Sequence, residues 1–105
     1  MAWPILLVAG AFEILWAWAM KQSDGFTRLP YVVIMLAGMA VSVVLLALAM
    51  RSLPLGTAYA VWTGIGAAGA FLIGILFLGE AATPLRLLAA ALIVGGIVLM
   101  KLAGD

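Results

Sequence analysis

The chain contains no cysteine and no histidine, and charged residues make up only 9% of its 105 positions. Without cysteine or histidine it can form neither a disulfide nor a Cys or His metal site, so we expect no metal and no cofactor. A net charge of +1 without a basic cluster argues against nucleic acid as a partner. Soluble domains carry about 25% charged residues. This composition, 69% hydrophobic, therefore predicts a protein embedded in a lipid bilayer.

The hydrophobic residues fall into four long runs separated by short polar breaks. About 20 residues cross a hydrocarbon core of about 30 Å as an α-helix. Helices are favoured because they satisfy their backbone hydrogen bonds within each run. The sequence predicts an all-α integral membrane protein, a single domain over residues 1–105, with transmembrane helices at 3–20, 31–50, 55–78 and 85–103.

The basic residues are almost balanced between the two membrane sides. Four spans place the N-terminus, the second loop and the C-terminus on one side, here side A, with Arg51, Lys101 and the terminal amine. The first and third loops, with Lys21, Arg28 and Arg86, lie on the opposite side B. The orientation of membrane helices follows the Lys/Arg bias, which is nearly absent here. Two arrangements are open: dual topology with antiparallel pairing of copies, or one orientation set by the first helix.

Glu13 is the only ionisable side chain well inside an apolar run. A charged side chain at the bilayer centre costs about 2.5–3.5 kcal/mol on insertion scales. A carboxyl group there is interpreted first as a proton carrier or a cation site. The alternative is a protonated structural carboxyl that bridges two helices.

Four further polar or aromatic residues are expected near the depth of Glu13. At about 1.5 Å per residue, Glu13 lies roughly 15 Å below side A, and Ser42 reaches a comparable depth. Tyr59 and Trp62 lie within a further turn or two, and Trp16 shares a face of the first helix with Glu13. A carboxylate accepts two hydrogen bonds from a planar guanidinium-like group, and indole rings attract cations. The layer therefore suits a small organic cation.

Each of the neighbouring residues also has a structural interpretation. Tyr59 and Trp62 are of the types that anchor helices at membrane interfaces. A serine in a membrane helix commonly bonds the carbonyl four residues earlier, which for Ser42 is that of Gly38. Trp18 lies about 200° around the helix from Trp16, so we expect it to contact lipid.

Small residues mark the third and fourth helices. Gly64 and Gly66 fall near the middle of the third helix, where they allow a kink beside a site or close helix packing. Ala91 and Gly95 form a small-xxx-small face, with Gly96 beside it, which suits contact between helices. We expect these three residues at a dimer contact.

The length of the chain favours a homodimer. Four helices with one carboxylate can hardly enclose an aqueous site, whereas two copies supply eight helices and a pair of Glu13 side chains. A site that holds either protons or a cation, but not both, couples their opposite movements when it alternates between the two sides. Protons, a small cation and a second copy are therefore the expected partners in the bilayer.

Three stretches of this sequence resemble the small multidrug resistance family, and more narrowly its guanidinium exporter subtype. These are residues 10–17 (GAFEILWA), the loop 25–28 (GFTR) and residues 54–66 (PLGTAYAVWTGIG). Trp16 and Lys101 resemble the guanidinium subtype. The resemblance extends over essentially the whole chain.

The resemblance implies an antiparallel, dual-topology homodimer in the bacterial inner membrane that exports small cations in exchange for protons. It implies that Glu13 binds substrate and protons alternately. It also implies that Trp16, Ser42, Tyr59 and Trp62 line the pocket and that the fourth helix carries dimer contacts.

Four functional hypotheses follow, in decreasing order of support. The first is proton-coupled export of guanidinium and small substituted guanidinium ions. The second is export of quaternary ammonium and other multidrug cations. The third is a membrane interaction subunit that does not transport. Enzymatic activity has little support, because the sequence offers no nucleophile–base pair.

Overall fold

The computed structural model of the protein describes residues 2–103. Met1, Gly104 and Asp105 lie outside the described residues, and so does the terminal amine that entered the charge balance. Each helix begins and ends within two residues of its expected range, and all four are long and apolar enough to cross a membrane. The prediction of four transmembrane helices is confirmed. They are α1 (Ala2–Gln22), α2 (Leu29–Ala49), α3 (Leu55–Phe77) and α4 (Pro84–Leu102).

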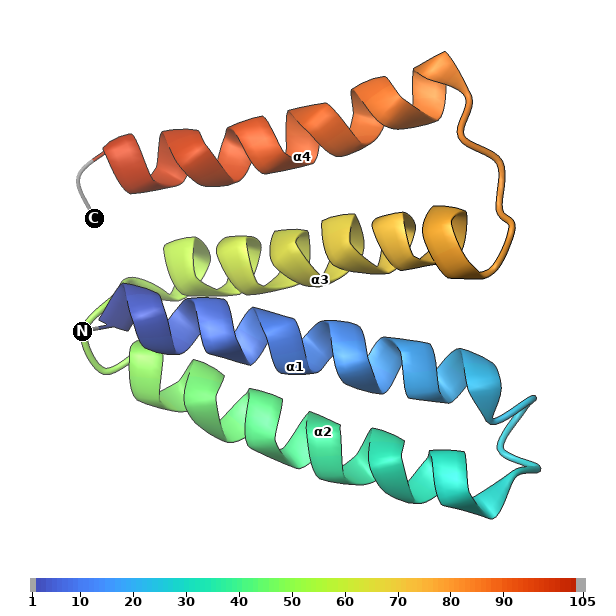
Figure 1. The fold of residues 1–105 in the computed structure, drawn as a ribbon. Helices are drawn as coiled ribbons and strands as arrows, with labels where there is room; N and C mark the ends of the chain where they lie inside the picture. The colour runs from blue at the N-terminus through green and yellow to red at the C-terminus, as the bar shows by residue number, and fades with distance from the viewer. Residues whose placement is uncertain (1, 104–105) are drawn as a thin grey trace.

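The helices form one layer in the spatial order α2, α1, α3, α4 (Figure 1). Successive helices run in opposite directions, so α1 and α3 are parallel. α1 packs against both α2 and α3, whereas within residues 2–103 α4 packs against α3. The layer measures 42 × 34 × 16 Å, and an α-helix with its side chains is about 10–12 Å across. A layer this thin leaves both of its broad faces uncovered within one chain.

Prolines stand where three of the helices begin. Pro30 and Pro84 occupy the first turns of α2 and α4, and Pro54 directly precedes α3. A proline costs little there, because the missing N–H would have had no partner in the helix. At α4 the hydroxyl of Thr83 also accepts a hydrogen bond from the N–H of Arg86, at 3.2 Å.

The first loop turns tightly through three residues with positive φ. Asp24, Gly25 and Phe26 have φ values of 52°, 70° and 69°, a conformation that costs energy for residues other than glycine. The buried hydroxyl of Ser23 donates to the carbonyl of Met20 at 2.6 Å and accepts from the N–H of Phe26 at 3.1 Å. These two bonds hold the chain in its turn from α1 to α2.

α1 and α3 approach closely because glycines on each helix receive side chains from the other. A Cβ atom at Gly10 would meet the Ile65 side chain, and one at Gly69 would meet Ile14. Gly66 faces Glu13 in the same way, whereas Gly64 faces Ile97 of α4. Close packing at Gly64 and Gly66 is thus present, while their proposed role in helix flexibility stays a prediction.

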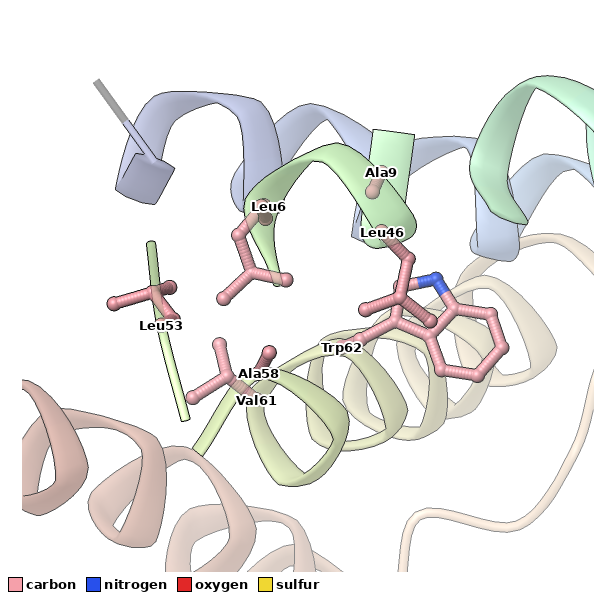
Figure 2. Close-up of a cluster of buried hydrophobic side chains, with 8 residues drawn as sticks. Leu6, Ala9, Leu46, Leu53, Ala58, Val61 and Trp62 are labelled. Atoms are coloured by element: carbon pink, nitrogen blue, oxygen red, sulfur yellow. The ribbon is translucent and has the colours of Figure 1, made fainter. Parts of the chain in front are cut away.

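The apolar core lies toward side A, where α1, the end of α2, the second loop and the start of α3 converge (Figure 2). The indole ring of Trp62 forms part of this core, with its nitrogen on the side of Ala9 and Leu46. The core therefore ties α1, α2 and α3 together. Its buried members are Leu6, Ala9, Leu46, Ala49, Leu53, Ala58, Val61 and Trp62.

α4 differs from the other helices because none of its residues is buried. Ala91 is exposed, and a Cβ atom at Gly95 or Gly96 would meet no atom within 4 Å. The three residues expected at a dimer contact are therefore uncovered within this chain.

The fit between α1 and α3 predicts that Gly10→Ala destabilises the protein. The added Cβ would lie 2.5 Å from Cγ2 of Ile65, and overpacking of this kind costs about 1–3 kcal/mol. Gly56→Ala is the control, because it also replaces a helical glycine with alanine but its Cβ meets nothing within 4 Å. Denaturation in detergent micelles, followed by tryptophan fluorescence, measures both. Equal unfolding free energies for the two variants would contradict this packing.

Candidate cation site at Glu13

The Glu13 carboxyl group lies against the backbone of α3. A Cβ atom at Gly66 would fall on the carboxyl group, so only glycine leaves room for it at that position. Oε1 of Glu13 is buried and has no hydrogen-bond partner within residues 2–103. Buried polar atoms almost always have partners. An acceptor left open in this way is available to a proton or to a bound cation.

Trp16 presents a second buried polar atom without a partner, one turn along α1. Its Nε1 is buried and makes no hydrogen bond among the described residues. The side chain passes over Gly38 of α2, where an added Cβ would lie 3.3 Å from Cβ of Trp16. A free acceptor and an unpaired indole N–H thus lie three residues apart on α1.

Ser42 connects three helices. Its hydroxyl donates to the carbonyl of Ala9 on α1 at 2.6 Å and accepts from Nε1 of Trp62 on α3 at 2.9 Å. The expected bond from Ser42 to the Gly38 carbonyl was wrong, because the closer acceptor belongs to the neighbouring helix. In an α-helix the carbonyl of residue 9 pairs with the N–H of residue 13. The relay from Trp62 through Ser42 therefore ends one turn from Glu13.

Trp62 and Tyr59 have different surroundings. Trp62 is 9% exposed and belongs to the core, so it is no interface anchor. Tyr59 is 53% exposed, and its ring centroid lies 5.5 Å from that of Trp62 at an interplanar angle of 47°. The contact places the Tyr59 ring beside Trp62 and its hydrogen bond to Ser42.

Trp18 has protein neighbours as well as an exposed part. Its ring meets Tyr31 of α2 edge-on, with centroids 5.8 Å apart and planes at 81°. It also lines a cavity between α1 and α3 together with Ala17 and Phe71. The expectation that Trp18 contacts lipid is incomplete, because part of the ring is held between helices.

The described residues combine a carboxyl group with indole rings and hold no cluster of metal ligands. Within residues 2–103, no three His, Cys, Asp or Glu side chains gather as metal ligands. The carboxyl group supplies the negative charge, and indole rings near it attract cations by the ring quadrupole. Lys101, on α4, makes such a contact itself: its Nζ lies 5.3 Å from the centre of the Trp3 ring.

Sequence reasoning missed the two glycines that shape the site. Gly66 was considered for flexibility and for packing in general, but not as the surface on which the Glu13 carboxyl rests. Gly38 was considered as an acceptor for Ser42, but its missing side chain admits Trp16. The spacing of Gly38 and Ser42, one turn apart, was a usable signal, because it places a small residue and a hydroxyl on one face of α2.

Four membrane-spanning helices and a partly buried carboxyl group, whose Oε1 has no partner within residues 2–103, define a small polytopic membrane protein with an ionisable residue inside one of its spans. Residues 1–93 match the family described as Small Multidrug Resistance protein. The chain is 56% identical to a guanidinium exporter of Citrobacter freundii over 98% of both chains. It is also 56% identical to a guanidinium exporter of Yersinia pseudotuberculosis, over 98% of this chain and 99% of the relative. The chain belongs to the Small Multidrug Resistance family, and it is a multi-pass protein of the cell membrane.

The relay predicts energetic coupling between Ser42 and Trp62. A double-mutant cycle of Ser42→Ala and Trp62→Phe should give a coupling of about 0.6 kcal/mol, the average measured for hydrogen bonds between membrane helices, and at most about 1.7 kcal/mol. Unfolding in detergent micelles measures each free energy. Ser52→Ala, at an exposed serine of the second loop, should show no coupling with Trp62→Phe. Additive effects of the Ser42 and Trp62 substitutions would mean that the bond contributes nothing.

Proposed function

We propose that the protein is a proton-coupled antiporter that exports guanidinium and small substituted guanidinium cations. The observation that carries the proposal is the buried Oε1 of Glu13, which lacks a partner within the described chain. The matching family and the relatives named guanidinium exporters support it. Transport in this scheme needs no covalent chemistry, so the proposed activity is transport and not catalysis.

Exchange follows from competition at Glu13. A guanidinium ion donates two parallel N–H bonds to the carboxylate, and a protonated carboxyl group has lost the charge that binds the cation. Each passage of the site across the membrane therefore carries protons or the cation. Transport of one against the other requires only that the site does not change sides empty.

The neighbouring residues shape the pocket. Trp16 offers an indole ring for cation–π attraction and an unpaired N–H. Ser42 and Trp62 hold α1, α2 and α3 in register through their relay, and Tyr59 extends the aromatic wall beside Trp62.

The working unit is an antiparallel homodimer with two copies of Glu13. A layer 16 Å thick leaves the site open on its broad faces, and a second copy closes it. α4 buries none of its own residues, which makes it suitable for contact with the partner. In this arrangement Ala91, Gly95 and Gly96 lie at the dimer contact, and Gly64 and Gly66 give α3 the flexibility to open alternately.

Glu13→Gln should abolish exchange without loss of folding. The amide keeps the size of the side chain, but it neither carries a proton nor pairs with a cation. Guanidinium gradients should drive proton movement in proteoliposomes of the wild type and not in those of the variant. Size-exclusion chromatography should give the same oligomer for both. Loss of the oligomer in Glu13→Gln would favour a structural carboxyl, and proton movement driven by tetraalkylammonium but not by guanidinium would favour the multidrug alternative.

Competition also fixes the sign of the pH dependence. Lower pH favours the protonated carboxyl group, so the KM for guanidinium should rise as the pH falls, by at least about tenfold per pH unit once the carboxyl groups are mostly protonated, since each cation displaces at least one proton. Initial exchange rates at several pH values, with equal pH on both membrane sides, measure this. A KM that does not change with pH would contradict a shared site.

A further inference from the structure

A cavity of about 300 Å³ lies between α1 and α3 toward side B, away from the apolar core. Lys21, in the last turn of α1 next to the first loop, and Glu80, in the third loop, both line it. In Figure 1 these loops are at the right, where the ribbons of α1 and α3 diverge. The exchange at Glu13 uses neither charge, so the proposed function does not explain why two charged side chains line this cavity.

The cavity adjoins the Glu13 site. Ala17 lines it from α1, one helical turn beyond Glu13, and Ala67 lines it from α3, next to the Gly66 on which the carboxyl rests. At about 1.5 Å per residue, Lys21 lies roughly 12 Å beyond Glu13. The cavity thus occupies the space between the buried carboxyl and the side-B surface.

Glu80 is held at the edge of this cavity. Its N–H donates to the carbonyl of Gly74 at 3.0 Å, and its carboxylate folds back onto Gly74, where any Cβ atom would collide with it. The carboxylate forms no ion pair within 4 Å in the part of the chain described, although Lys21 lines the same cavity. Glu80 is therefore an exposed negative charge beside Gly74 without an ion-pair partner among the described residues.

Trp18 supplies an aromatic ring on the same wall. Its edge-on contact with Tyr31 holds the indole in place, and the ring lines the cavity with Glu80 and Phe71. A carboxylate together with an indole repeats the combination of Glu13 and Trp16. Since a water molecule takes about 30 Å³, the cavity accommodates a four-heavy-atom guanidinium ion with several waters.

We propose that Glu80 and Trp18 form a second, weak binding site for the transported cation, on its way between side B and Glu13. The proposal rests on the proposed function, because the ligand is the substrate cation. Lys21 keeps the site weak by partly offsetting the charge of Glu80. A binding site on the way to Glu13 must have low affinity, because a cation that binds tightly at the entrance does not move on to the next site.

Glu80→Gln tests the proposal in the guanidinium–proton exchange assay. A cleft lined by charges of one sign raises association of a charged substrate by about 10–1,000-fold. One carboxylate partly offset by Lys21 supplies only a part of such an effect, so kcat/KM for guanidinium should fall about three- to tenfold with kcat retained. Lys21→Gln should change kcat/KM in the opposite direction. Trp18→Leu should weaken uptake as Glu80→Gln does, and 0.5 M NaCl should shrink the Glu80 effect by screening.

Two controls test whether the effect depends on the position of the Glu80 carboxylate or only on the total charge at side B. Asp24→Asn removes a carboxylate from the other side-B loop, and asparagine tolerates the φ of 52° at that residue. It should leave kcat/KM unchanged. Gly74→Ala keeps the charge of Glu80 but displaces it, so it should reproduce most of the Glu80→Gln effect in protein that remains monodisperse in detergent.

Three results would overturn the second site. They are a wild-type kcat/KM in Glu80→Gln, an equal loss in Asp24→Asn, and losses in both Lys21→Glu and Glu80→Lys that the double exchange restores. The last result would identify a closing ion pair instead. Failure of the proposed function is distinguishable, because it would abolish guanidinium exchange in the wild type, whereas failure of this inference leaves wild-type exchange intact.

Discussion

The Glu13 carboxyl group needs space between two packed helices, and the missing side chain of Gly66 provides it. Because glycine has no side chain, α1 and α3 can approach closely at the depth of Glu13, and a Cβ atom at residue 66 would collide with the carboxyl group. The same approach accommodates Ile65 at Gly10 and Ile14 at Gly69. The packing of the two parallel helices and the location of the ionisable site are thus one constraint. A change in the separation of α1 and α3 changes the surroundings of Glu13.

The second constraint is the satisfaction of polar atoms without water. The Ser42 hydroxyl accepts a hydrogen bond from Nε1 of Trp62 and donates one to the Ala9 carbonyl. One hydroxyl therefore fixes the relative positions of three helices. Oε1 of Glu13 and Nε1 of Trp16 are the exceptions within the described residues. These two unpaired atoms lie beside a relay whose polar atoms are paired, and the proposed cation site rests on that contrast. The rigid relay and the open site lie one helical turn apart.

Much of the fold could be predicted from the spacing of the apolar runs, because helix length is set by membrane thickness. Glu13 could be found for the same reason, as the one charge far from the end of a run. The approximate depths of Ser42 and Trp62 followed from a fixed rise per residue. The partner of Ser42 could not be predicted, since the choice between Gly38 and Ala9 depends on how α1 rotates against α2. The cavity at Glu80 was equally out of reach, because it depends on a loop carboxylate folding back onto Gly74.

The amino-acid sequence by itself determined that this is a four-helix membrane protein with one carboxyl group deep in the bilayer. The reason is that the hydrocarbon core of the bilayer sets both the apolar composition and the length of each span. The tertiary structure decided which atoms meet that carboxyl group. It placed Gly66 beneath Glu13, sent the Ser42 hydroxyl to another helix, and left α4 with an uncovered surface. Those outcomes depend on helix rotation and side-chain fit, which arise only when the helices pack together.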